Sequence, residues 1–228
     1  MLNKVRAPIN RALGPVVRAI ASTGVKPDVI TTIGTIGVAG GALGFYTRGV
    51  FFLGTVVITA FVFSDLLDGM IARYQDASST WGAFLDSSLD RVGDGAIFGS
   101  LVIWYAGRGH SVLLAGVALF VLVMGSVTSY IKARAQSLGL SCDVGFAERA
   151  ERLIIVLVAA GLYGLGVPYL LPAALWFLAG ATFVTVIQRL VEVHRQACGP
   201  RRPRRRTIRP SRTRRTGRVR SGSRAPHE

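Results

Sequence analysis

Four aspartates recur at helical spacing within hydrophobic segments of the chain. Asp65 and Asp68 stand three positions apart, and Asp86 and Asp90 stand four positions apart. Side chains at these spacings share one face of an α-helix. A short connection at residues 74–81 would let the two helices fold back on each other. The spacing therefore predicts four carboxylates around one cavity.

Carboxylates gathered at membrane depth need cations between them, because four like charges cannot all stay ionised otherwise. Oxygen ligands suit hard divalent cations such as Mg²⁺ or Mn²⁺, and no Cys or His accompanies them to favour zinc. Two ions would clamp a diphosphate. Gly69, Ala72 and Gly82 leave space beside the carboxylates for a nucleotide or diphosphate. Arg73 adds a fork-shaped donor for phosphate oxygens, so the residues predict a metal–phosphate site.

Two other interpretations of the aspartates remain open at this point. Ion pairs with Arg73 and Arg91 would explain one or two acids, but four acids and the neighbouring Asp94 leave a surplus. Intramembrane acids also mark proton and cation pathways, so a cation transporter is the alternative outside enzyme chemistry. The interleaved small residues favour a substrate pocket.

The segments that position these aspartates are long and apolar. The chain has 228 residues, of which 50% are hydrophobic, and its mean hydropathy is +0.45. A helix needs about 20 apolar residues to cross a bilayer. The sequence predicts an all-α polytopic membrane protein, with one domain over residues 1–195 and six transmembrane helices at roughly 29–46, 50–73, 82–105, 110–135, 153–165 and 169–193.

The first two segments of the chain carry their own packing signals. Residues 1–25 have apolar side chains at helical spacing with Arg11 and Arg18 between them, which predicts a juxtamembrane amphipathic helix on the membrane surface; a fraying terminus is the alternative. The first predicted span carries five glycines, and small residues let helices approach closely. We expect them to pack within the bundle, with a dimer face as the alternative.

Most of the net charge of +15 belongs to the C-terminal tail. Residues 196–228 hold 12 Arg and one acid, and the rest of the chain holds 15 basic and 11 acidic residues. This tail, poor in apolar residues, is predicted to be disordered and solvated, without a specific nucleic-acid partner. Binding to anionic lipid headgroups or nonspecific binding to nucleic acid are alternatives.

Loop charge predicts the orientation in the cell membrane. Six spans put both termini on one side, and the loops of the opposite side hold only Arg48 and Arg108 as basic residues. Basic loops stay cytoplasmic. We therefore expect both termini and the aspartate site at the cytoplasmic face, with Cys142 and Cys198 as free thiols.

The aspartate pattern resembles the signature of a known family. It reads D-x2-D-G-x2-A-R-x8-G-x3-D-x3-D from Asp65 to Asp90, with every fixed position of the CDP-alcohol phosphatidyltransferases present. The resemblance covers about residues 1–195. It implies a homodimeric membrane transferase with two Mg²⁺ or Mn²⁺ ions per active site. An acceptor hydroxyl would attack the phosphate attached to diacylglycerol in CDP-diacylglycerol, and CMP would leave.

The resemblance also implies a role for each residue of the pattern. Asp90 would share in metal binding or act as the general base. The other metal ligands would be Asp65, Asp68 and Asp86. The residues implied around CDP-diacylglycerol are Asp28, Gly69, Ala72, Arg73 and Gly82.

The second half of the chain bears on the acceptor. Its segments 129–135, 146–153 and 188–190 resemble the actinobacterial phosphatidylinositol phosphate synthases, which join CDP-diacylglycerol to inositol phosphate. Lys132, Arg152 and Arg189 could form a cationic cage for that phosphate, with Ser129 as a further donor. Arg134 and Arg149 are weaker candidates. The alternative is that these cations only reach toward anionic headgroups.

A cationic cage alone does not name the acceptor. Glycerol 3-phosphate is also a phosphorylated polyol, which leaves a phosphatidylglycerophosphate synthase as the enzymatic alternative. Free inositol would not need the cage. Release of CMP from CDP-diacylglycerol separates either enzyme from the transporter.

Overall fold

The computed structural model describes the backbone of residues 27–74 and 79–198 and the side chains of residues 28–63 and 79–198. All regular structure in these ranges is helical, and the six predicted helical segments are confirmed as helices. The elements are α2 (Pro27–Phe45), the 3₁₀ turn η1 (Tyr46–Arg48), α3 (Phe51–Tyr74), α4 (Thr80–Ala106), α5 (Val112–Ser137), α6 (Arg149–Gly164) and α7 (Leu170–Cys198). The helix predicted in residues 1–25 and the tail from residue 199 lie outside the described residues.

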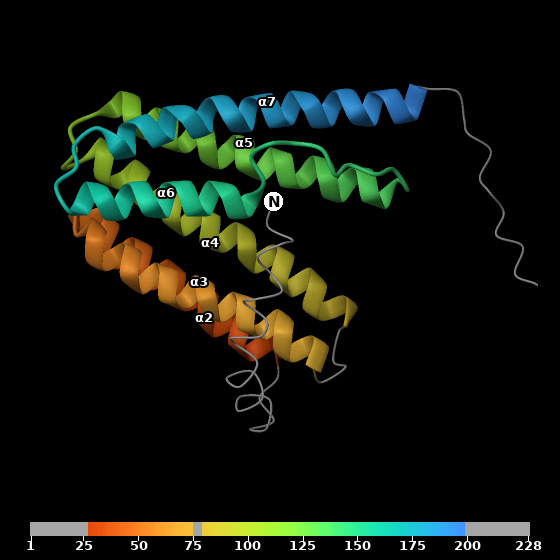
Figure 1. Ribbon diagram of the computed structural model, residues 1–228, viewed down its shortest axis with the longest axis horizontal. Coiled ribbons are helices and arrows are strands. Elements are labelled where there is room, and N and C mark those ends of the chain that lie inside the picture. The colour runs from red at the N-terminus through yellow and green to blue at the C-terminus, as the bar shows by residue number, and fades with distance from the viewer. Residues whose placement is uncertain (1–26, 75–78, 199–228) are drawn as a thin grey trace, which may run out of the picture. The chain divides into compact units, whose positions relative to one another are not determined.

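The helices pack as two pairs that two further helices connect. In Figure 1, α2 lies along α3 and α5 lies along α7. Helix α4 packs against both α2 and α5, and α6 packs against both α3 and α7. Side chains at the start of α6 and in the first half of α4 can therefore meet between the α2–α3 pair and the α5–α7 pair.

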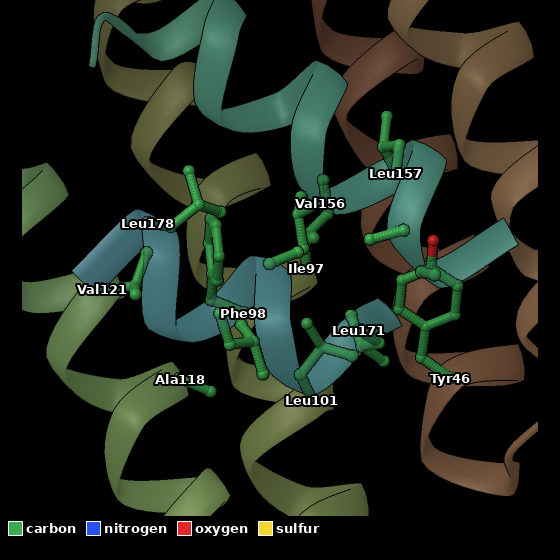
Figure 2. Packing of buried hydrophobic residues seen from close by; sticks show 14 of the residues in the cluster. Tyr46, Ile97, Phe98, Leu101, Ala118, Val121, Val156, Leu157, Leu171 and Leu178 are labelled. Atoms are coloured by element: carbon green, nitrogen blue, oxygen red, sulfur yellow. The ribbon is translucent and has the colours of Figure 1, made fainter. Parts of the chain in front are cut away.

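The core is built from the inner faces of these helices. Figure 2 shows Ile97, Phe98 and Leu101 of α4 among side chains of three other helices, including Val121, Val156 and Leu178. All six of these side chains are buried. One apolar cluster thus fixes the rotation of α4 about its own axis, and with it the direction of the aspartates one to three turns earlier.

Two glycines of α2 explain its close approach to α3. A Cβ at Gly37 would clash with the Phe61 ring, and a Cβ at Gly41 would lie 3.1 Å from the side chain of Ile58. The predicted packing within the bundle is confirmed for these two positions. Gly40 and Gly44 have open space beside them.

Side-chain caps set where the site-bearing helices begin. The first backbone N–H groups of a helix have no partner inside it. At the start of α4, Gly82 N–H donates to Ser79 Oγ at 2.9 Å. At the start of α6, Glu148 and Glu151 form a capping box, in which Glu148 N–H donates to Glu151 Oε2 at 2.8 Å.

Three of the described segments are long and apolar enough to cross a membrane. They are Asp28–Arg48, Val112–Ser137 and Leu170–Cys198. The apolar part of α3 is shorter, at Phe51–Phe63, the first half of α4 is charged, and α6 has 16 residues. These findings support a membrane protein, and the count of six spans stays a prediction.

Candidate active site

The first turns of α2 and α4 meet at Gly82. A Cβ built on Gly82 would lie 3.3 Å from Oδ1 of Asp28. The absence of a side chain at Gly82 therefore leaves room for the Asp28 carboxylate. Two residues predicted beside the nucleotide, 54 positions apart in sequence, are neighbours in space, and their role stays a prediction.

Asp86 and Asp90 follow on α4, one turn apart. Asp86 is exposed, and the side chain of Asp90 is 17% exposed. The backbone of α3 is helical through Asp65 and Asp68, so their predicted i, i+3 spacing on a helix is confirmed. The side chains of Asp65, Asp68, Gly69, Ala72 and Arg73 lie outside the described residues.

The donor chemistry on α4 fits a hard divalent cation. Asp86 and Asp90 supply carboxylate oxygens, the ligands that Mg²⁺ and Mn²⁺ prefer. Among the side chains that the structure describes, no group of three or more His, Cys, Asp or Glu forms a metal site by itself. A complete site would therefore need the α3 aspartates as well.

Arg149 joins the α4 carboxylates to the start of α6. Its Nη1 lies 2.8 Å from Oδ1 of Asp90, and its Nε donates to Oδ1 of Asp94 at 3.3 Å. A second arginine, Arg91, lies 3.4 Å from Oδ2 of Asp90. Arg149 thus bridges two carboxylates that stand one helical turn apart.

Arg152, one turn further along α6, is the most deeply buried of the predicted acceptor-binding cations. It is 2% exposed, and its Nη2 donates to Oδ2 of Asp94 at 3.1 Å. Its Nη1 donates to the Ala147 carbonyl at 3.3 Å. A Cβ on Gly125 of α5 would lie 3.1 Å from Cζ of Arg152. A buried charge requires such partners, and here they fix the guanidinium from three sides.

These contacts form one continuous series of ion pairs, Asp90–Arg149–Asp94–Arg152, which we call the α4–α6 ion-pair chain. Two negative and two positive groups alternate along it, so their charges balance. It connects the predicted catalytic carboxylate to a predicted acceptor-binding cation.

Lys132 pairs with a carboxylate in the loop between α5 and α6. Its Nζ lies 2.9 Å from Oδ1 of Asp143, whose side chain is 73% exposed. The hydrogen bond and charge of Lys132, with a smaller contribution from Arg189, hold the pKa of Asp143 below its ordinary value of 3.8. The pair is open to solvent and is therefore weak.

Arg189 of α7 is buried, and two of its N–H groups donate to backbone carbonyls. Its Nη1 donates to the Thr128 carbonyl at 2.7 Å and its Nε to the Val144 carbonyl at 2.9 Å. Its Nη2 lies 3.8 Å from Oε1 of Glu148. These contacts tie α5 and the following loop to α7, and the phosphate-binding role that the sequence suggested for Arg189 stays a prediction.

That loop, residues 139–148, is attached to one face of α7 at two more points. Ala147 N–H donates to Thr185 Oγ1 at 3.1 Å. The Gln196 side-chain amide forms two hydrogen bonds with the Ser141 backbone. It accepts from the Ser141 N–H at 3.1 Å and donates to the Ser141 carbonyl at 2.7 Å. Thr185, Arg189 and Gln196 recur at helical spacing, so one face of α7 holds the loop.

The predicted acceptor-binding residues thus gather along one stretch of α5. Arg152 lies against Gly125, Arg189 binds the Thr128 carbonyl, and Lys132 is one turn later. Ser129 lies in the same stretch and is half-buried.

Sequence reasoning undervalued two members of the ion-pair chain. Arg149 was only a weaker candidate, and Asp94 was only a surplus acid. A signal for Asp94 was present, since residues 86, 90 and 94 continue one four-residue spacing on α4. No sequence pattern indicated which cation Asp94 would meet.

Comparison with known proteins adds independent information. The family model described as CDP-alcohol phosphatidyltransferase matches residues 25–188. A phosphatidylinositol phosphate synthase of Streptomyces avermitilis is 54% identical over 205 residues, which cover 86% of this chain and 84% of the relative. One of Cutibacterium acnes is 44% identical over 206 residues, 87% of this chain and 99% of the relative.

Solved structures show the same fold. The crystal structure of Mycobacterium tuberculosis phosphatidylinositol phosphate synthase with CDP-DAG bound superposes with a TM-score of 0.77 at 41% identity, covering 81% of this chain and 94% of that one. The structure of the same enzyme in complex with manganese and citrate has a TM-score of 0.73 at 41% identity, covering 78% and 87%.

Proposed function

The chain belongs to the CDP-alcohol phosphatidyltransferase family, and from that premise we propose that it transfers the phosphatidyl group of CDP-diacylglycerol to myo-inositol phosphate. The products are phosphatidylinositol phosphate and CMP. The names of its relatives support this acceptor. Membership of an enzyme family sets the cation-transporter alternative aside.

One observation carries the choice of a phosphorylated acceptor. Lys132, Arg152 and Arg189 gather along α5, and the α4–α6 ion-pair chain connects Arg152 to Asp90. A phosphate bound by these cations would have its polyol near the proposed base. All three would bind the phosphate through charge-assisted hydrogen bonds, and Arg189 would also hold the pocket wall.

In the proposed reaction, Asp90 accepts the proton of an acceptor hydroxyl. The hydroxyl oxygen forms a bond to the phosphorus attached to diacylglycerol, and the bond from that phosphorus to the CMP oxygen breaks. Arg149 holds Oδ1 of Asp90 and so orients the carboxylate. Asp65, Asp68, Asp86 and Asp90 would hold two Mg²⁺ or Mn²⁺ ions. Bound there, the ions would neutralise the diphosphate and the departing phosphate.

The nucleotide end of CDP-diacylglycerol would bind where α2, α3 and α4 begin or end. The proposed contacts are Asp28, Gly69, Ala72, Arg73 and Gly82. The proximity of Asp28 to Gly82 supports this, since it brings two of the proposed contacts together at the starts of α2 and α4. The manganese complex of the mycobacterial enzyme supports use of a divalent metal by this fold.

We further propose six spans with both termini and the active site on the cytoplasmic side of the cell membrane. Soluble inositol phosphate would enter from the cytoplasm, while the acyl chains of the lipid substrate stay in the bilayer. A homodimer is proposed from the family resemblance alone.

The decisive experiment measures CMP release by purified protein with Mg²⁺ and CDP-diacylglycerol. Inositol phosphate, glycerol 3-phosphate and free inositol are compared as acceptors. Release with inositol phosphate alone supports the proposal. Release only with glycerol 3-phosphate would keep the transfer reaction and overturn the acceptor. Excess EDTA should abolish release, and added Mg²⁺ or Mn²⁺ should restore it.

A further inference from the structure

Asp94 lies outside the four-aspartate pattern, yet it is the most buried of the described aspartates on α4. It is 8% exposed, and both of its carboxylate oxygens accept hydrogen bonds. Oδ1 accepts from Arg149 Nε at 3.3 Å, and Oδ2 accepts from Arg152 Nη2 at 3.1 Å. One carboxylate thus holds two arginines of α6 that stand three positions apart.

We propose that Asp94 is a positioning residue for the acceptor, which sets where the guanidinium of Arg152 lies relative to Asp90. The inference rests on the proposed function, because it concerns the phosphate of the same acceptor. Asp94 itself would touch neither substrate.

The geometry leaves Arg152 few other positions. Gly125 stands on one side of its guanidinium, the Ala147 carbonyl accepts from Nη1, and Asp94 takes Nη2. Without the Asp94 charge, an almost fully buried cation would lose its counter-ion, and such a cation moves toward water or another acid. Arg152 would then shift relative to any phosphate bound beside Lys132.

Arg149 adds a second consequence. Because it bridges Asp90 and Asp94, loss of the Asp94 charge leaves Asp90 as its remaining carboxylate partner in the ion-pair chain. Asp94 therefore separates two arginines that would otherwise compete for Asp90. With the phosphate bound at Arg152, the acceptor hydroxyl lies beside Asp90 only while Arg149 and Arg152 both stay in these positions.

The test compares Asp94→Asn with Ser100→Ala, using CMP release at varied acceptor and varied CDP-diacylglycerol. Ser100 is a matched control, since it is a fully buried polar residue of α4 that bonds only its own helix, at the Ile97 carbonyl. Asp94→Asn should raise the acceptor KM by about 10- to 100-fold and leave the CDP-diacylglycerol KM within about twofold. Ser100→Ala should change neither.

A double-mutant cycle separates positioning from general destabilisation. Arg152→Lys should raise the acceptor KM in the wild-type background and add little in the Asp94→Asn background. Asp94→Glu, which keeps the charge, should restore part of the loss. Additive effects of the two mutations, or equal increases in both KM values, would overturn the proposal.

Two further outcomes remain decisive. If Asp94→Asn does not fold, Asp94→Glu is compared with wild type instead, and an unchanged acceptor KM would reject the positioning role. If wild-type protein releases no CMP with inositol phosphate, the proposed function fails. Normal wild-type turnover with unaltered kinetics in Asp94→Asn would reject this inference alone.

Discussion

Asp94 and Arg152 stand 58 positions apart in the sequence and form a buried ion pair with a distance of 3.1 Å between Oδ2 and Nη2. The pair joins α4, which carries the proposed catalytic aspartates, to α6, which carries the proposed phosphate-binding cation. Through Arg149 it extends to Asp90. The proposed phosphate-binding cation and the proposed general base are therefore connected by direct contacts between charged side chains.

Gly125→Ala tests how tightly Arg152 is held from the α5 side. The added Cβ would lie 3.1 Å from Cζ of Arg152. The ion pair with Asp94 opposes any movement of the guanidinium away from its present position. Overpacking of this kind costs about 1–3 kcal/mol. We expect the acceptor KM to rise at least about fivefold, with little change for CDP-diacylglycerol. Gly116→Ala is the control on the same helix, because no atom lies within 4 Å of the new Cβ. An unchanged acceptor KM in Gly125→Ala would show that Arg152 has room to move.

Asp90→Asn tests the proposed general base. The variant should lose turnover by about 10²- to 10⁴-fold, the usual contribution of a general base. Folding should change little, since Arg149 keeps Asp94 as a partner when the Asp90 charge is removed. Thermal unfolding in detergent and CMP release report the two quantities separately. Ser88→Ala, on the opposite side of α4, should keep full activity. Turnover of Asp90→Asn at the wild-type rate would remove Asp90 from the base role.

Arg189→Ala tests whether this residue mainly anchors the 139–148 loop. Its removal would leave the Thr128 and Val144 carbonyls without this donor, and loss of a partner costs about 1–3 kcal/mol at a buried group such as Thr128. We expect a lower melting temperature, faster hydrogen exchange in residues 139–148 and a raised acceptor KM. The KM for CDP-diacylglycerol should rise far less.

Thr185→Val provides the comparison, because it removes another loop anchor without changing a charge. It should increase exchange in the loop and affect the acceptor KM less than Arg189→Ala. Equal kinetic effects would assign Arg189 to anchoring alone. A kinetic effect of Arg189→Ala without faster exchange would instead identify it as a direct phosphate ligand.

Asp143→Asn should improve acceptor binding. Asp143 pairs with Lys132, so an incoming phosphate has to compete with it for the ammonium group. Because the pair is solvent-exposed and weak, the acceptor KM should fall only about two- to fivefold. Lys132→Gln should act in the opposite direction. A higher acceptor KM in Asp143→Asn would mean that the pair organises Lys132 rather than competing for it.

The effect of Asp143 should be constant across the neutral pH range. Its pKa in the folded protein is below the ordinary value of 3.8, because Lys132 donates a hydrogen bond to it. The stabilising contribution of the pair is present above that ordinary value, and it is lost only as the pH falls through the lowered value. Kinetics of wild type and Asp143→Asn measured at several pH values between roughly 6 and 8 should therefore keep a constant ratio.

The two native cysteines test the proposed orientation. Cys198, at the end of α7, is exposed, whereas Cys142 is fully buried. A membrane-impermeant maleimide should label inside-out vesicles and leave intact cells unlabelled. Cys198→Ser should remove the labelling, and Cys142→Ser should not. Labelling of Cys198 in intact cells would reverse the proposed topology.

The sequence alone determined the helices and the family to which the chain belongs. Long apolar segments made six helices predictable, because helix formation depends on local composition and length. The spacing of Asp86 and Asp90 follows directly from helical periodicity. The identity of the family followed from the fixed positions of one contiguous pattern.

Only the tertiary structure decided which charges meet. The sequence offers many arginines near the ends of helices, and nothing in it distinguishes Arg152, which pairs with Asp94, from Arg189, which binds backbone carbonyls. That distinction depends on the rotation of each helix, which buried side chains such as Phe98 and Leu178 set together. An ion pair requires atoms within about 4 Å, and packing between distant segments fixes positions at that scale.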